Sequence, residues 1–302
     1  MEQTDSPVII GIGELLWDML PAGKRVGGAP GNFVYHATKQ GGRCCVISAI
    51  GNDALGEELL KELNENGVGH CLTRSPYPTG TVQVTLKDGI PSYNIVEDVA
   101  WDHIQVCEEA IELMKKADAV CFGTLALRGE ESRKTLETLL SYLPEKALIF
   151  FDANLRPPHY SRSMIESSLS KSDIFKLNDE ELQILIPMFD LPKTEKEACR
   201  ELVKRYDLRY LILTAGGKYS SVYTKHRVST IPSLKVEVVD TVGAGDAFSS
   251  AFVYHILVGN PLQHAHFMAI KTAAEVVSHS GAWALPVRGT ARSGITSSGQ
   301  GY

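Results

Sequence analysis

The amino-acid sequence predicts a three-layer α/β fold, in which helices cover a mainly parallel central sheet and a small β-sheet lid projects from it. Apolar strands alternate with amphipathic helices along most of the 302 residues, and this alternation is typical of parallel sheets with helical crossovers. Residues 79–101 depart from this rhythm, because polar and apolar side chains alternate there with the period of two that a hairpin shows.

The first part of the chain supplies two buried strands and two helices. Residues 8–13 and 46–50 are short apolar runs, as buried strands are. Residues 32–39 predict a helix with Asn32 as its N-cap, because asparagine is favoured at that position. Residues 53–66 predict a charged amphipathic helix. These elements open the strand–helix alternation.

Residues 79–102 predict a hairpin that stands apart from the main sheet. Residues 81–86 and 91–96 alternate polar and apolar side chains, and Lys-Asp-Gly at residues 87–89 is a turn sequence. A one-sided hairpin in an α/β chain suits a lid, to which residues 16–26 are expected to contribute. The alternative is an edge hairpin without a moving role.

The alternation then resumes and continues almost to the end of the chain. Strands are predicted at residues 119–122, 147–152, 174–177 and 210–214, with a further strand-like stretch at 236–239. Helices are predicted at residues 108–116, 130–142, 179–185, 195–206, 244–258 and 261–278. With no dividing linker, residues 1–288 are expected to form one domain. Residues 289–302, rich in Gly, Ser and Thr, are expected to be a mobile tail.

The bulk composition excludes several classes of function. A formal net charge of −6 argues against nucleic-acid binding, which needs a basic surface. The six cysteines include no Cys-x-x-Cys pair, so free thiols in a reducing compartment are expected. No apolar run is long enough to span a bilayer, and the first residues lack a secretory signal. We therefore expect a cytoplasmic protein without membrane or nucleic-acid partners.

The most informative motif is Asp-Thr-Val-Gly-Ala-Gly-Asp-Ala-Phe at residues 240–248. Small residues at Gly243, Ala244 and Gly245 leave backbone N–H groups uncovered at the start of a helix, where anions are attracted. Asp246 then lies in the first helical turn, beside the expected anion. A base that takes a proton from an attacking hydroxyl explains a carboxylate there. The alternative is an ordinary helix start with a favoured acidic residue.

Further candidate residues follow other predicted strands, at the sheet edge where α/β proteins bind ligands. Asp18 lies in the loop after the first strand and could accept sugar hydroxyls, or serve only in a turn. Glycine-rich residues 27–31 allow a ligand to approach the backbone, and Asn32 could contact it or only cap a helix. Arg156 follows a later strand and could bind a phosphoryl group, with a surface salt bridge as the alternative.

Two more motifs lie at strand ends in the second half of the chain. Asn178 and Glu181 are three residues apart at the start of a helix and could hold Mg²⁺ partly through water. The same spacing also produces a capping box. Thr214 and Gly216 could meet a nucleotide or form a plain turn.

The order of these motifs resembles the ribokinase/PfkB family of sugar kinases over roughly residues 7–288. The resemblance implies a ribokinase-like fold with a β-sheet lid, ATP as the phosphoryl donor, Mg²⁺, and often a stimulating K⁺. The implied roles cover four groups of residues. They are Asp246 as base; the N–H groups of Gly243, Ala244 and Gly245 as anion hole, with Arg156; Asn178 and Glu181 for Mg²⁺; and Thr214 and Gly216 for the nucleotide. The resemblance also implies sugar contacts from Asp18, Gly28 and Asn32, and monovalent-cation ligands at Asp240, Val242 and Gly281.

The choice of sugar is predicted from a narrower resemblance. Gly-Gly-Ala-Pro at residues 27–30 is similar to fructokinases, whereas ribokinases carry Gly-Gly-Lys-Gly. The sequences Gly-Glu-Leu-Leu-Trp-Asp at 13–18 and Ala-Trp-Asp at 100–102 are also similar to fructokinases. We therefore expect D-fructose, phosphorylated on a primary hydroxyl and bound near Tyr93 and Ile95 of the lid. Ribose, 2-keto-3-deoxygluconate and aminoimidazole riboside are the alternative acceptors, and a non-catalytic sugar-binding regulator is the alternative class.

The expected partners are therefore a small-molecule sugar and ATP. The lid hairpin could also form a homodimer, because Val82, Val84 and Leu86 would share one face of it and require cover.

Overall fold

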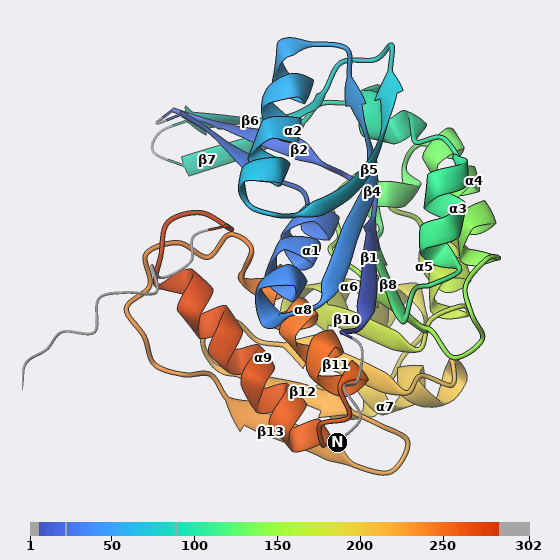
Figure 1. Ribbon diagram of the computed structural model, residues 1–302. Coiled ribbons are helices and arrows are strands. Elements are labelled where there is room, and N and C mark those ends of the chain that lie inside the picture. The colour runs from blue at the N-terminus through green and yellow to red at the C-terminus, as the bar shows by residue number, and fades with distance from the viewer. Residues whose placement is uncertain (1–5, 22, 88–89, 284–302) are drawn as a thin grey trace, which may run out of the picture.

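Figure 1 shows the fold in a computed structural model, which describes residues 6–21, 23–87 and 90–283, with the backbone alone at residues 84–87 and 90–93. The predicted tail at residues 289–302 lies outside the described residues.

Within the described residues, the central sheet has nine strands in the order β13-β12-β11-β10-β9-β8-β1-β4-β5. The strands are β1 (Val8–Ile12), β4 (Arg43–Gly51), β5 (Gly69–Ser75), β8 (Ala119–Gly123), β9 (Leu148–Asp152), β10 (Ile174–Asn178), β11 (Tyr210–Thr214), β12 (Tyr219–Tyr223) and β13 (Val228–Pro232). The strands from β5 to β11 pair in parallel, and β12 and β13 extend the sheet in antiparallel fashion. The predicted mainly parallel sheet is confirmed.

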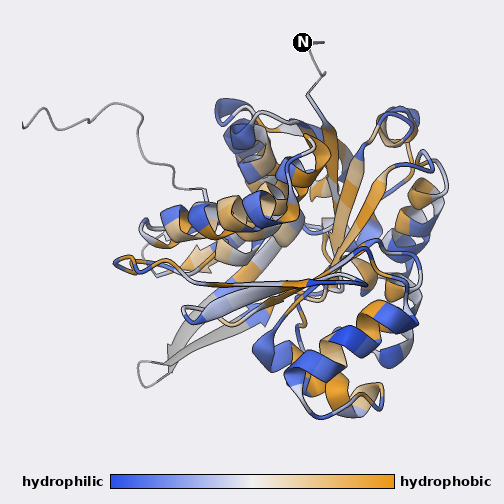
Figure 2. Cartoon of the chain, turned by 90° about the horizontal axis from the view of Figure 1, so that it is seen from below, coloured by the Kyte–Doolittle hydropathy of each residue, from blue (hydrophilic) through white to orange (hydrophobic). Residues whose placement is uncertain are grey.

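Helices cover both faces of this sheet, and each face has its own apolar core. One cluster contains side chains from α1 (Ala29–Gln40), α2 (Ala54–Glu65), α8 (Ala244–Leu257) and α9 (Leu262–Val277). The opposite cluster contains side chains from α3 (Glu108–Met114), α4 (Glu130–Leu140), α5 (Arg162–Leu169), α6 (Asp179–Met188) and α7 (Glu195–Arg205). Figure 2 shows the result, with apolar strands inside and hydrophilic outer faces on the helices. Burial of apolar surface on both faces stabilises the three layers.

The second, smaller sheet has the order β3-β2-β6-β7 and projects from the body of the protein (Figure 1). Its strands are β2 (Leu16–Leu20), β3 (Gly23–Gly27), β6 (Gly80–Lys87) and β7 (Ile90–Ile95). Asp18 was expected in a loop but lies in β2, because residues 16–20 pair with both β3 and β6. Val82 was expected on an exposed face but is only 7% exposed. It therefore requires no second copy to cover it.

The first helix begins earlier than predicted, and this difference moves Asn32 into a new role. Gly28 is the N-cap of α1 with a φ of 105°, and proline follows in the first turn, where its fixed φ suits a helix start. A Cβ at Gly28 would lie 2.2 Å from the Glu14 carbonyl oxygen, so glycine is required at this turn. Asn32 is therefore inside the helix, and its side chain is free for other contacts.

The strand-like stretch at residues 236–239 is not a strand in the structure. These residues run without regular structure between β13 and α8. Val238 is 62% exposed and Val239 59% exposed. β-branched residues favour strands only where a neighbouring strand or core can pack against them, and this stretch has neither.

A buried ion pair anchors the end of the small sheet to the central sheet. The Arg128 guanidinium donates to both carboxylate oxygens of Asp102, over 2.7 and 2.8 Å, and to the Val96 carbonyl over 2.6 Å. It also lies 3.9 Å from the centroid of the Trp101 ring. Asp102 and Trp101 belong to the short helix η1 (Ala100–His103), and Arg128 directly follows the short helix η2 (Leu125–Leu127) after β8. One side chain therefore joins the segment after β8, η1 and the chain leaving β7.

We predict that Arg128→Met lowers the free energy of unfolding by about 3 kcal/mol, because it leaves the Asp102 carboxylate buried without its partner. Urea unfolding followed by circular dichroism measures this loss. Lys134→Gln is the matched control, since Lys134 and Glu130 form an exposed pair on α4 whose loss should change stability by less than about 0.5 kcal/mol. Equal stability of the two variants would contradict the prediction.

Candidate active site

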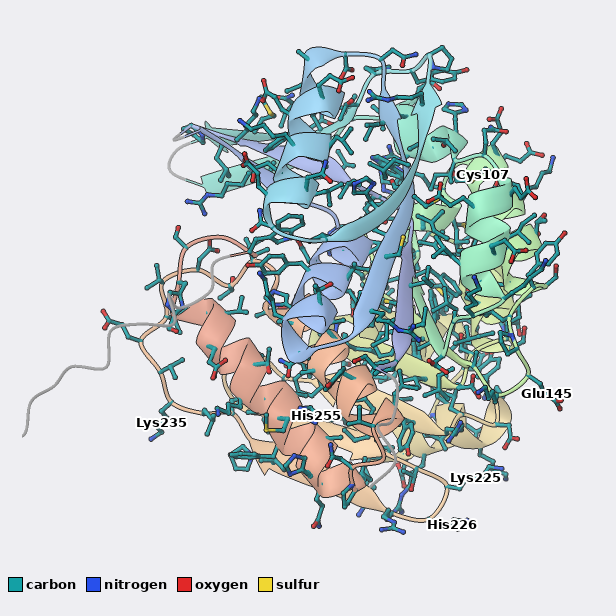
Figure 3. The ribbon with its side chains drawn as sticks, in the orientation of Figure 1. Cys107, Glu145, Lys225, His226, Lys235 and His255 are labelled. Carbon is teal, nitrogen blue, oxygen red and sulfur yellow. The ribbon has the colours of Figure 1, made fainter. Side chains whose placement is uncertain are left out.

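The predicted site residues lie around the carboxyl ends of the central parallel strands. Asn178 and Thr214 are neighbours at the ends of β10 and β11, and Asp152 ends β9. Figure 3 labels Lys225 and His226 on the turn between β12 and β13. This turn lies at the amino ends of the parallel strands, on the side of the sheet away from the small sheet. The candidate site therefore occupies the edge that faces the small sheet.

Asp246 is half-buried in the first turn of α8 and is held by Asn32 from α1. The Asn32 Nδ2 donates to Asp246 Oδ2 over 2.8 Å. The orientation of the Asn32 amide is fixed, because its Oδ1 accepts from the indole N–H of Trp283 over 2.8 Å. Trp283 in turn stacks on Tyr35, with 4.7 Å between ring centroids. The sequence did not predict this role for Trp283.

The surroundings of Asp246 raise the pKa of its carboxyl to about 6. Burial is the largest cause, because it disfavours the charged form. The positive charge of Lys176 opposes this effect, the Asp152 carboxylate adds to it, and the Asn32 hydrogen bond opposes it. The carboxyl is therefore ionised at neutral pH and basic enough to accept a proton, as a general base requires.

The turn that precedes Asp246 presents free backbone N–H groups. Gly243 is the N-cap of α8 with a φ of 78°, and a Cβ there would lie 2.5 Å from the Ala282 Cβ. Among the described residues, the N–H groups of Gly243 and Gly245 have no hydrogen-bond partner, whereas Ala244 N–H donates to the Thr241 carbonyl over 3.3 Å. Two of the three predicted anion-hole groups are thus free to bind a phosphoryl oxygen.

Lys176 and Asp152 form a buried ion pair beside this turn, which the sequence analysis did not assign to the site. Lys176 Nζ donates to Asp152 Oδ2 over 2.7 Å, and a Cβ at Gly245 would lie 3.2 Å from the same Nζ. Burial lowers the pKa of Lys176, but the surrounding carboxylates outweigh it and raise the pKa overall. A lysine within the apolar strand Ile-Phe-Lys-Leu was the available signal, since lysine is seldom buried without a partner.

Asn178 and Glu181 form the capping box that their spacing permits. Asn178 Oδ1 accepts from Glu181 N–H, and Glu181 Oε2 accepts from Asn178 N–H, both over 2.8 Å. Glu181 Oε1 accepts from Leu155 N–H over 2.8 Å. Burial and the Asp152 carboxylate raise the pKa of Glu181.

The Mg²⁺ prediction fits this corner of the site only through water. All three oxygens of the capping box already accept one backbone hydrogen bond, and no group of three or more His, Cys, Asp or Glu side chains within the described residues could hold a metal ion by itself. The buried Asp152 Oδ1 has no hydrogen-bond partner and can accept from a metal-bound water. Mg²⁺ commonly keeps several waters beside substrate phosphates, so these residues suit it.

On the side of the small sheet, two carboxyl groups titrate near neutrality. Burial raises the pKa of Asp18 to about 6, Arg25 lowers it, and Asp240 raises it. Burial likewise raises the pKa of Glu14 to about 7, and its Oε1 accepts from Ala29 N–H over 3.3 Å. Glu14 was not among the predicted site residues.

The remaining predicted residues differ in how they relate to the site. Arg156 is exposed and its positive charge lowers the pKa of both Asp246 and Glu14. Among the described residues it has no carboxylate within salt-bridge distance, so the surface salt bridge is not formed. Ile95 packs against the cluster of Val99, Trp101 and Leu125 rather than against Asp246. Tyr93 lies in β7, and its side chain is outside the described residues.

The three predicted cation ligands do come together, but they surround a side-chain cation. Asp240 Oδ1 accepts from Val242 N–H over 3.0 Å, and Asp240 Oδ2 accepts from Gly281 N–H over 2.9 Å. Arg25 Nη1 donates to the same Oδ2 over 3.2 Å. Gly216, the last of the predicted residues, follows β11, and its carbonyl accepts from the Ser233 hydroxyl.

This arrangement can perform an acid–base transfer next to an anion. A basic carboxylate, free N–H groups at a helix start and a charged lysine lie within one turn of α8 and its neighbours. Such a group of residues suits transfer of a negatively charged group to a hydroxyl.

In the part of the chain that the structure describes, no helix is long and apolar enough to cross a membrane.

Comparison with known proteins agrees with this geometry. The model of the pfkB family carbohydrate kinases matches residues 21–287. Fructokinase-1 of Zea mays is 29% identical over 272 residues, which cover 83% of each chain. The structure of a sugar kinase from Pyrococcus horikoshii has a TM-score of 0.80 at 28% identity and covers 92% of this chain and 94% of its own.

A fructokinase from Vibrio cholerae, solved with fructose, ADP and calcium, has the same fold. Its TM-score is 0.78 at 22% identity, over 92% of this chain and 94% of its own. The family match spans most of the chain, and the sheet order and helix layers fit it. This chain belongs to the pfkB family of carbohydrate kinases.

Proposed function

We propose that this protein is an ATP-dependent fructokinase, which transfers the γ-phosphoryl group of ATP to a primary hydroxyl of D-fructose. One observation carries the proposal. The carboxylate of Asp246, with a pKa of about 6, is held by Asn32 beside the free N–H groups of Gly243 and Gly245. A base and an anion site in one helical turn are what attack of a hydroxyl on phosphorus requires.

In the proposed reaction, Asp246 accepts the proton of the sugar hydroxyl as that oxygen bonds to the γ-phosphorus and the bond to the ADP oxygen breaks. Asn32 keeps the carboxylate in position, because Trp283 fixes the orientation of its amide. A hydrogen bond to the ionised form also limits the rise in the pKa of Asp246, so that the base is charged before the sugar binds.

Negative charge spreads over the phosphoryl oxygens during transfer, and the site offers positive groups to meet it. The N–H groups of Gly243 and Gly245 lie at the positive end of the α8 dipole, and Lys176 lies next to Gly245. Arg156 adds an exposed guanidinium. Mg²⁺ bound with ATP would be held through water by Asn178 and Glu181 and would neutralise charge on the phosphates.

The proposed monovalent cation fits these residues poorly. The Asp240 carboxylate already accepts from three donors, and one of them, Arg25, brings a full positive charge. No step of the proposed reaction therefore involves K⁺.

Fructose is proposed as the acceptor from the local sequence and from the relatives. The Gly-Gly-Ala-Pro turn at residues 27–30 begins α1 and packs against Glu14. Asp18 lies nearby on β2, and its carboxylate can bind sugar hydroxyls. The maize fructokinase resembles this chain in sequence, and the Vibrio cholerae fructokinase shares its fold. These comparisons support fructose among the possible sugars.

We predict that fructose is the best substrate in a coupled assay of ATP turnover with fructose, ribose, 2-keto-3-deoxygluconate and aminoimidazole riboside. Asp246→Asn should lower kcat by at least ~10², the usual contribution of a general base, while sugar affinity by calorimetry changes little. Glu108→Gln, in the first turn of α3, is the matched control and should keep full activity. Full activity in Asp246→Asn would exclude Asp246 as the base, and a better sugar than fructose would overturn the proposed acceptor.

The raised pKa of Asp246 predicts an acidic limb in the pH profile. Because the base must be ionised, kcat should be constant above pH 7 and fall tenfold per unit once the pH drops below about 6. Asp18 has a pKa of about 6 as well, so kcat/KM reports both groups together. In Asp18→Asn, kcat at saturating sugar should still fall as the pH drops below about 6. A kcat that stays constant down to pH 4.5 would contradict the assignment.

A homodimer through the small sheet remains a prediction, but one of the three residues that favoured it no longer does. Val82 is already buried within one chain, and the side chains of Val84 and Leu86 lie outside the described residues. Light scattering of the purified protein measures the mass directly. The predicted dimer requires twice the mass of one chain, and a monomeric mass would exclude it.

A further inference from the structure

Arg25 links the small sheet to the segment that leads into α8. It lies in β3, and its guanidinium makes two contacts far away in the sequence. Nη1 donates to Asp240 Oδ2 over 3.2 Å, and Nη2 donates to the Ser280 hydroxyl over 2.8 Å. The side chain also packs against the backbone, since a Cβ at Gly281 would lie 3.4 Å from Arg25 Cδ. One positive side chain thus joins three segments of the chain.

The Asp240 carboxylate is the point where these segments meet. It accepts from the N–H groups of Val242 and Gly281 as well as from Arg25. Val242 immediately precedes the Gly243 turn, which lies against Ala282, because a Cβ at Gly243 would be only 2.5 Å from the Ala282 Cβ. Ala282 is followed by Trp283, which orients Asn32. A change at Asp240 would therefore reach both the anion-binding turn and the base.

Arg25 also lies between two carboxylates. Asp18 is its cross-strand partner in the pairing of β2 and β3, and Asp240 is its ion-pair partner. The charges of Arg25 and Asp240 both affect the titration of Asp18, in opposite directions. Without Arg25, the negative charges of Asp18 and Asp240 would repel each other with no cation between them.

We propose that Arg25 is a positioning residue that supplies the positive charge at Asp240, so that phosphoryl transfer by this protein needs no free monovalent cation. The guanidinium holds the Asp240 carboxylate, which fixes Val242 and Gly281 and thereby the Gly243 turn. The inference rests on the proposed function, because the turn is given its role by phosphoryl transfer.

The first test compares turnover with and without K⁺. Wild type, Arg25→Gln and Arg25→Lys are assayed with ATP, Mg²⁺ and fructose in KCl or tetramethylammonium chloride, both at ~0.1 M so that charge screening is equal. The kcat of wild type should differ by less than about twofold between the two salts. Arg25→Gln should lose at least ~5-fold in kcat without K⁺, the effect of a partly exposed charged hydrogen bond, and regain activity with K⁺. Arg25→Lys should retain most activity in both salts.

The second test needs no activity. Thermal unfolding of the substrate-free proteins is followed in the same two salts, and K⁺ should raise the Tm of Arg25→Gln but not that of wild type, because only the variant leaves Asp240 open to a cation. Arg74→Gln is the matched control, an equally exposed arginine in a pair with Glu57 that should respond to neither salt.

The two tests separate failure of the inference from failure of the proposed function. A wild type that requires K⁺, or an Arg25→Gln variant with unchanged kcat and no K⁺-dependent Tm, would overturn the role of Arg25. A wild type that phosphorylates no sugar would instead overturn the proposed function, and the Tm comparison would still decide whether Arg25 fills the cation position.

Discussion

The hydrogen bond between Asn32 and Asp246 is the contact on which the geometry of the site depends. It joins the first helix of the chain to the helix that carries the proposed base, across 214 positions of sequence. The bond forms only because Gly28 starts α1 one turn earlier than an asparagine cap would, which places Asn32 on the inner surface of the helix. Trp283 fixes the orientation of the Asn32 amide, because its indole N–H donates to the amide oxygen. The start of one helix therefore determines the position of a carboxylate on another.

The charged side chains around Asp246 are paired with one another or with backbone groups, which leaves the backbone donors of the anion site available. Two carboxylates, Asp152 and Glu181, lie close enough to Lys176 to affect its titration, and their negative charge would repel a phosphate. Lys176 is paired with Asp152, and Glu181 is bound by two backbone N–H groups. Burial makes these pairings necessary, because an unpaired charge inside the protein is costly. The free N–H groups of Gly243 and Gly245 then remain as uncompensated donors, which suits them to an anionic ligand.

Much of the fold could be predicted from the sequence, because most central strands are uninterrupted apolar runs and most helices have clear amphipathic periods. The missed elements lack these signals: β5, β12 and β13 mix polar and apolar residues toward the two sides of the sheet, and α5 is short and rich in serine. The site could be predicted in part, since glycine-rich turns and acidic residues at strand ends are local patterns. Trp283 and Arg25 could not, because their roles depend on contacts with partners more than 200 positions away.

Two carboxyl groups, the buried Glu14 and the half-buried Asp246, have pKa values in the range that suits a base, and their positions distinguish them. Glu14 Oε1 accepts from Ala29 N–H, and its own carbonyl lies against Gly28, so this residue belongs to the turn that starts α1. Asp246 accepts from a side-chain amide and lies one residue beyond the free N–H of Gly245. A proton acceptor must be adjacent to the anion site in order to serve a hydroxyl that attacks the bound phosphoryl group. Asp246 meets this condition because it directly follows Gly245 in the chain. It is therefore the residue we propose as the base, and Glu14 instead shapes the glycine turn.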